Sequence, residues 1–112
     1  MDSTDGEEAP KWFMERVCVL LKKNDLSAVI KEVINNTAVI ELQDNTSMTV
    51  RAGEILMEAP KEHDTVLVTG GADVGVEGEL VCIDGSDAIL KDSNEDFKIV
   101  DFIYLAKIIS DA

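Results

Sequence analysis

The sequence predicts an all-β protein made of two small barrels packed together. The first observation is the segment 65–90, in which apolar strand-like runs flank a glycine cluster that a helix would not carry. The second is the density of strands, because three of them fit within this short segment. The third is that the second half of the chain repeats the order of strands and turns seen in the first half.

Composition places the chain among globular proteins. It has 112 residues and is 46% hydrophobic, which suits one compact protein. No apolar run approaches the ~18 residues of a membrane span. The acidic N-terminus lacks the positive flank and apolar stretch of a signal peptide. We therefore expect a protein that is neither secreted nor bound to a membrane.

The start of the chain has a polar segment followed by an apolar one. Residues 1–11 are mostly polar and acidic and are predicted to form a disordered tail. The apolar residues of 12–21 have helical spacing, but Val17 and Val19 are β-branched and suit a strand. Two alternatives follow: a helix over this segment, or a turn followed by a strand over residues 16–21.

The first predicted barrel spans residues 12–59 and is built around a hairpin. Strands at 28–34 and 37–42 flank Asn35 and Asn36, which readily adopt the left-handed conformations of a two-residue turn. The second of these strands alternates between two faces, as a half-buried antiparallel strand does. The remaining elements are a strand at 47–50, a single helical turn at 51–55 and a strand at 56–59.

The second predicted barrel spans residues 60–112. Asp84 and Gly85 form a strong two-residue turn signal. The strands are predicted at 65–69, 79–83, 88–91 and 98–102, followed by a turn near 103–105 and a last strand ending at 109. The connector that begins at Pro60 is too short and stiff for an independent linker. Each barrel alone has a marginal core, so we expect the two to form one cooperative unit.

The glycines of the second half have a regular spacing. Gly71, Gly75 and Gly78 follow the apolar run 66–68 and precede Leu80. This spacing resembles the KOW motif, in which spaced glycines separate two apolar strands. Together with the apolar runs upstream, it makes residues 12 to 109 similar to the C-terminal tandem SH3-like region of the nuclear DNA- and RNA-binding protein KIN. The corresponding region of the G-patch and KOW spliceosomal proteins is similar too. The resemblance implies a short turn over 12–15 and a strand over 16–21, in place of the helix.

The resemblance implies a non-catalytic interaction module of nuclear RNA processing, associated with the spliceosome or another ribonucleoprotein. Such a monomeric module would dock mainly on a splicing-factor or ribonucleoprotein protein with a basic surface. The alternative is direct binding of single-stranded RNA or DNA. KOW motifs commonly carry a basic residue before the middle glycine, whereas this chain has Val74 beside Asp73. This departure argues against a phosphate contact at that position.

The charge distribution separates these two hypotheses. The net charge of −13 disfavours a general polyanion binder, because nucleic-acid affinity comes mainly from Lys and Arg. Residues 11–31 nevertheless carry a local charge of +3, from five bases minus two acids. The nucleic-acid candidates are Lys11, Trp12, Arg16, Lys22, Lys23 and Lys31. Trp12 has two interpretations: stacking on a base, or packing at the domain edge.

An acidic run in the second half is the candidate surface for a basic protein partner. Its carboxylates are Asp92, Glu95 and Asp96, at the predicted tip of a hairpin. Attraction between opposite charges steers association, so these acids would draw a basic protein and repel phosphate.

The residues needed for catalysis are not arranged in a recognisable pattern. His63 is the single histidine and is predicted to be a solvated loop residue, and no nucleophile has a recognisable context. Cys18 and Cys82 lie in apolar runs and are predicted to be buried thiols and not a disulfide. Two isolated cysteines and one histidine do not make a zinc site. We therefore predict no catalytic residue, metal or cofactor, and rank an enzyme subunit or metabolite binder last.

Overall fold

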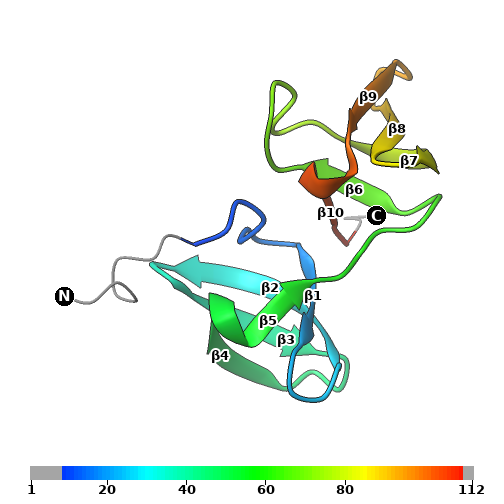
Figure 1. The fold of residues 1–112 in the computed structure, drawn as a ribbon. Coiled ribbons are helices and arrows are strands. Elements are labelled where there is room, and N and C mark those ends of the chain that lie inside the picture. The colour runs from blue at the N-terminus through cyan, green and yellow to red at the C-terminus, as the bar shows by residue number, and fades with distance from the viewer. Residues whose placement is uncertain (1–8, 110–112) are drawn as a thin grey trace.

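The structure is a computed structural model that describes residues 9–109 (Figure 1). These residues form two five-stranded antiparallel sheets joined by a short connector, and their only helices are two 3-10 turns. No helix in this range is long and apolar enough to cross a membrane. The prediction of an all-β fold is therefore confirmed for the described residues.

The strands of both sheets follow the same order in space. The N-terminal sheet has the order β4-β3-β2-β1-β5 and the C-terminal sheet the order β10-β6-β7-β8-β9. The N-terminal sheet consists of β1 (Cys18–Leu21), β2 (Ser27–Ile34), β3 (Thr37–Leu42), β4 (Ser47–Arg51), the 3-10 turn η1 (Ala52–Glu54) and β5 (Ile55–Met57). The C-terminal sheet consists of β6 (Thr65–Val68), β7 (Glu77–Asp84), β8 (Asp87–Asp92), β9 (Phe97–Asp101), the 3-10 turn η2 (Phe102–Tyr104) and β10 (Leu105–Lys107).

The two sheets repeat each other at a constant sequence offset. β2 begins at residue 27 and β7 at residue 77, and the same difference of 50 positions separates β3 from β8, β4 from β9 and β5 from β10. A register shift follows Ile30 in β2 and Leu80 in β7. The backbone also turns left-handed at matching positions, with φ 55° at Asn35 and 64° at Gly85. Each residue from β2 to β5 therefore has a counterpart 50 positions later, whereas β1 and β6 begin 47 positions apart, at residues 18 and 65.

Each sheet encloses its own apolar core. The largest fully buried side chains of the N-terminal sheet include Ile30 and Ile40, and their counterparts Leu80 and Leu90 are equally buried. They point inward because alternate residues of a strand face the same side. Branched aliphatic side chains fill this half-buried pleated surface well.

Side chains of the last strand, β10, belong to both cores. Leu105 lies in the C-terminal core, whereas its neighbour Ala106 and the following Ile108 belong to the N-terminal core. Leu67 of β6, which pairs with Ala106, is half-buried against the same N-terminal core. Val17 and Ile108 also form an isolated antiparallel bridge. The two sheets thus share apolar packing and a main-chain contact, while their cooperative unfolding stays a prediction.

The predicted elements agree with the structure in kind and differ at several ends. Residues 18–21 form a strand, so the helical alternative for this segment is wrong. The turn after β7 consists of Gly85 and Ser86, one residue later than the predicted pair Asp84 and Gly85. β7 begins at Glu77, two residues before the predicted start, because Leu67 of β6 pairs with it. Most of the predicted tail, residues 1–8, lies outside the described range.

Candidate interaction surfaces

The basic residues of the first half lie in different places. Arg16 precedes β1, whereas the exposed Lys22 and Lys23 follow it in the β1–β2 loop, at the opposite end of the strand. Lys31 lies on β2 and makes an ion pair with Glu41 on the neighbouring strand, with 3.5 Å between Nζ and Oε1. These four predicted nucleic-acid candidates therefore do not converge on one surface.

Two of these candidates are engaged with the rest of the protein. The half-buried Trp12 packs edge-on against the ring of Phe13, with 6.0 Å between centroids and 69° between planes, and contacts the N-terminal core. This position favours the packing interpretation of Trp12 over base stacking. The Arg16 guanidinium makes an ion pair with Glu77 of β7, with 3.1 Å between Nη1 and Oε2. It thereby connects the two sheets.

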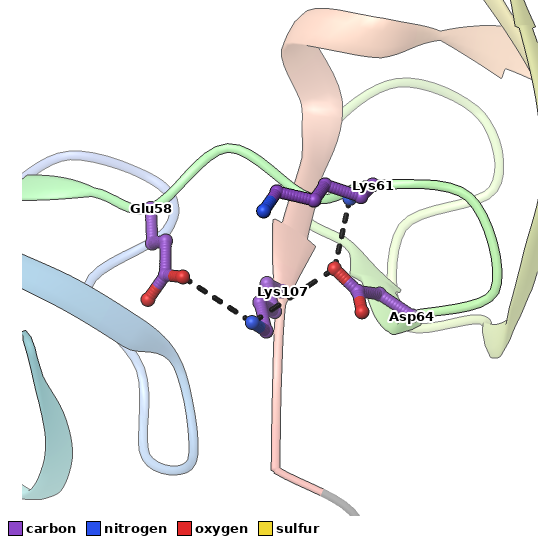
Figure 2. A network of polar contacts seen from close by, with 4 residues as sticks. All are labelled: Glu58, Lys61, Asp64 and Lys107. Carbon is purple, nitrogen blue, oxygen red and sulfur yellow. Dashed lines mark hydrogen bonds and ion pairs between the residues drawn. The ribbon is translucent and has the colours of Figure 1, made fainter.

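A second polar network holds the connector between the sheets (Figure 2). Lys107 Nζ on β10 lies 3.2 Å from Glu58 Oε2, just after β5, and 3.9 Å from Asp64 Oδ2, just before β6. The same Asp64 oxygen accepts a hydrogen bond of 2.8 Å from the Lys61 amide. Burial by itself lowers the pKa of Lys107, but the hydrogen bond and charge of Glu58, with the charge of Asp64, raise it above its ordinary value.

The acidic turn between β8 and β9 has two kinds of carboxylate. Asp92 Oδ1 accepts hydrogen bonds from the amides of Asn94 and Asp96, at 2.9 and 3.0 Å. Glu95 holds a left-handed conformation with φ 66°. Asp92 thus shapes the turn in the way Asx residues do, while Glu95 and Asp96 are exposed at its tip. Of the three predicted docking acids, Glu95 and Asp96 face solvent.

The KOW glycines meet three different structural requirements. Gly71 has φ 81° and lies under the Tyr104 ring, so that an added Cβ would approach the ring to 3.1 Å. Gly75 has φ 96° but open space around it. Gly78 has an ordinary φ, but an added Cβ would collide with the main-chain carbonyl of Lys91. Close approach of another chain segment therefore favours glycine at positions 71 and 78, whereas at position 75 only the left-handed backbone favours it.

A shallow pocket of about 330 Å³ lies between the β6–β7 loop and β9. Its acidic lining consists of Asp73, Asp87 and Asp101, and no lysine or arginine lines it. The remaining lining residues are Gly70, Gly71, Ala72, Ile99, Val100 and Tyr104. Asp87 and Asp101 are direct cross-strand partners. The pocket is therefore suited to a cation and unsuited to phosphate.

An exposed apolar stripe accompanies this pocket. Phe97 is 65% exposed and Ile99 is 69% exposed, and both alternate with less exposed residues along β9. Their counterparts in β4, at the offset of 50, are Ser47 and Thr49. The predicted strand at 98–102 did not reveal this stripe, because β9 begins one residue earlier, at Phe97, and its residue types match those of a core strand. A comparison of the two repeats position by position provides the missing signal.

The single histidine and the two cysteines lie outside these surfaces. The His63 side chain is 80% exposed, as predicted, with Nδ1 3.2 Å from Glu79 Oε2. Both cysteines are free; Cys18 is buried as predicted, but Cys82 is only half-buried on β7. Burial, reinforced by the nearby charge of Glu58, raises the pKa of the Cys18 thiol.

Two comparisons with known proteins find similarity to transcription elongation factors. Residues 59–108 match the family model described as the seventh KOW domain of transcription elongation factor SPT5. The chain is also 35% identical over 118 aligned positions to the transcription elongation factor SPT5 homolog 1 of Arabidopsis thaliana. That alignment covers 97% of this chain and 11% of the relative, so the chain spans about a tenth of the relative's length. The KOW motif predicted from the glycine spacing is thus supported, and the proteins found to be similar are SPT5 elongation factors, not KIN or the G-patch proteins.

Proposed function

Because residues 59–108 match a KOW domain of the SPT5 type, we propose that this chain is a non-catalytic interaction module of nuclear transcription elongation. This proposal replaces the expectation of a splicing module, since the matching family model and the similar relative are both described as transcription elongation factors. The module docks mainly on a protein of the elongation machinery. The match between the KOW family model and the strands β6–β10 is the observation that carries the proposal.

Protein docking is preferred over nucleic acid because of the charges around the KOW loop. Val74, which stands where KOW motifs commonly carry a base, is 55% exposed. Beside it, Asp73 joins Asp87 and Asp101 in lining the pocket. Phosphate groups would approach these acids unfavourably, since the Debye length of about 8 Å at physiological salt leaves neighbouring charges unscreened. A protein with a basic surface is attracted by the same field.

Direct binding of single-stranded RNA or DNA is the second candidate function. One observation favours it: Lys22 and Lys23 are exposed in the β1–β2 loop, on the sheet that lies away from the acidic pocket. Lysines in such a loop can neutralise phosphates one by one. Without a stacking platform nearby, this contact would be weak and independent of sequence.

The proposed function is tested by expressing the tagged chain in cells of the source organism and measuring its recruitment to the transcription machinery. The chain is expected to co-purify with RNA polymerase during transcription elongation after nuclease treatment, because protein contacts hold it there. A titration of fluorescent single-stranded RNA in increasing salt provides the second measurement. Recruitment that disappears with nuclease, together with RNA affinity that falls steeply with salt, would establish the second candidate instead.

A further inference from the structure

The repeat provides an internal reference for the surface of the C-terminal sheet. Ser47 and Thr49 of β4 have polar side chains where Phe97 and Ile99 of β9 expose aromatic and aliphatic ones. Since the two sheets share strand order and register, the fold itself does not require apolar groups at these sites. Exposed apolar side chains that the fold does not need are typical of a binding surface.

A pair of like charges lies beside this stripe. Asp87 on β8 is directly opposite Asp101 on β9, and both are exposed. Their counterparts in the N-terminal sheet, Thr37 and Arg51, are also directly opposite each other and carry no such repulsion. Like charges at opposed positions in a sheet destabilise it. A cationic side chain of a ligand placed between the two carboxylates would remove this cost.

The position of β9 suits an extended ligand. β9 is the last strand of its sheet and pairs only with β8 among the described strands. An edge strand offers main-chain groups to an added strand, and alternate side chains of that strand then meet alternate surface features. The ligand would have apolar side chains over Ile99 and a basic one in the pocket beside Tyr104. An aromatic ring near two carboxylates favours a guanidinium or ammonium group.

The negative charges of this surface determine which class of molecule can bind to it. A second copy of the chain would bring another net charge of −13 and a second Asp87–Asp101 pair to the contact. A nucleic acid would bring phosphates to the same carboxylates. A basic polypeptide segment alone complements both the apolar stripe and the acids.

We propose that the free edge of β9, with Phe97, Ile99, Asp87 and Asp101, binds an extended segment of a partner protein in which arginine or lysine alternates with aliphatic residues. The segment adds to the C-terminal sheet as a further strand. This inference rests on the proposed docking function and names the face and the chemistry of the partner.

The test uses the full chain and a defined probe. The probe is a fluorescent peptide of about ten residues in which arginine and valine alternate, and its control has glutamate in place of arginine. Binding is followed by anisotropy and mapped by amide chemical shifts. The variants take residues from the N-terminal sheet: Ile99→Thr and Asp101→Arg. Glu62→Arg, at an exposed position of the connector, makes the same charge change away from the face.

The wild-type chain is expected to bind the arginine peptide and not the glutamate peptide, with shifts confined to β9 and the β6–β7 loop. Affinity should fall by about tenfold or more in Ile99→Thr and in Asp101→Arg, and stay within about twofold in Glu62→Arg. The melting temperature of Asp101→Arg should not fall, because a repulsive pair is removed, so lost binding there is not lost folding. Equal binding by all variants, shifts elsewhere, or no binding by the wild type would overturn the inference.

Recruitment in cells separates this inference from the function on which it rests. If the Asp101→Arg chain still joins the elongating polymerase as well as wild type, the face is wrong and the proposed function stands. If the wild-type chain binds the peptide in vitro but is not recruited, the face is supported and the proposed function fails.

Discussion

Arg16 and Ile109, which are 93 positions apart in the chain, are hydrogen-bonded to each other in both directions. The Ile109 amide donates to the Arg16 carbonyl at 3.1 Å, and Arg16 Nη2 donates to the Ile109 carbonyl at 3.0 Å. The Val17–Ile108 bridge lies directly beside this pair. The contact brings the start of β1 and the residues after β10 together and ties one sheet to the other.

The first prediction concerns cooperativity. Ile108→Ala removes a buried side chain of the N-terminal core and should destabilise the protein by about 2–5 kcal/mol. Because Ile108 follows the last strand of the other sheet, both sheets should melt together at the lower temperature. Fluorescence of the single Trp12 reports the N-terminal sheet and absorbance of the single Tyr104 reports the C-terminal one. Separate midpoints for the two signals would contradict the prediction.

The second prediction compares the KOW glycines. Gly78→Ala should cost roughly 2–4 kcal/mol, because its Cβ would collide with the main-chain carbonyl of Lys91 and the backbone would have to shift. Gly75→Val should cost roughly 1–3 kcal/mol, because of its left-handed φ alone. Gly53→Ala is the matched control, since its site is open and needs no positive φ. Urea unfolding measures all three, and an order other than Gly78, Gly75, Gly53 would show that the loop is built differently.

The third prediction is a pH dependence of the Lys107 network. The folded pKa of Lys107 is raised, so the charged form stabilises the fold at all pH values below the unfolded lysine value of about 10.4. Lys107→Met should therefore melt at a lower temperature than wild type at neutral pH. The difference should shrink as the pH rises through the folded pKa, above about 10.4. Melting curves of both proteins from pH 7 to the alkaline limit measure it, and a constant difference would exclude this role for the charge.

The fourth prediction concerns thiol reactivity. Cys18 is buried with a raised pKa, so little thiolate is present at neutral pH and an aromatic disulfide reagent should reach it only after unfolding. Cys82 is half-buried on β7 and should react faster in the native protein. The Cys82→Ser variant isolates the signal of Cys18. Two equally fast thiols in the folded wild type would contradict this difference.

The fifth prediction uses charge to test the docking partner. Lys22→Glu with Lys23→Glu should barely change recruitment to the native assembly, whereas Glu95→Gln with Asp96→Asn should slow it by weakening attraction to a basic protein. Asp92 is left unchanged because its carboxylate holds the turn. Recruitment kinetics at physiological salt provide the measurement. The opposite pattern would support direct nucleic-acid contact through the basic stretch.

Local patterns were sufficient to predict much of the fold. β3 was predicted with its observed ends, because strict alternation and the two asparagines before it agree. The strand at β1 depended on the resemblance, since its apolar spacing fits a helix as well. The turn after β7 was displaced by one residue, because Gly85 accepts the left-handed first position of the turn as easily as its second.

Such local patterns do not predict contacts between segments that are distant in the sequence. Ala106 and Ile108 belong to the N-terminal core, and no local periodicity says which core an apolar residue joins. Arg16 makes an ion pair with Glu77, and Lys31 makes one with Glu41. These partners likewise depend on how the strands are aligned, which local patterns do not reveal. The apolar stripe on β9 was missed for a different reason, because its residue types match those of a core strand.

The position of Ile108 has a consequence for synthesis of the protein. Chains emerge from the ribosome at about 5–20 residues per second, and N-terminal parts generally fold first. Here the apolar centre between β1 and β3 stays incomplete until Ala106 and Ile108 have left the exit tunnel. The nascent N-terminal half therefore lacks the contact between Val17 and Ile108 while the second half is being translated. Apolar surface that stays uncovered during this interval favours aggregation.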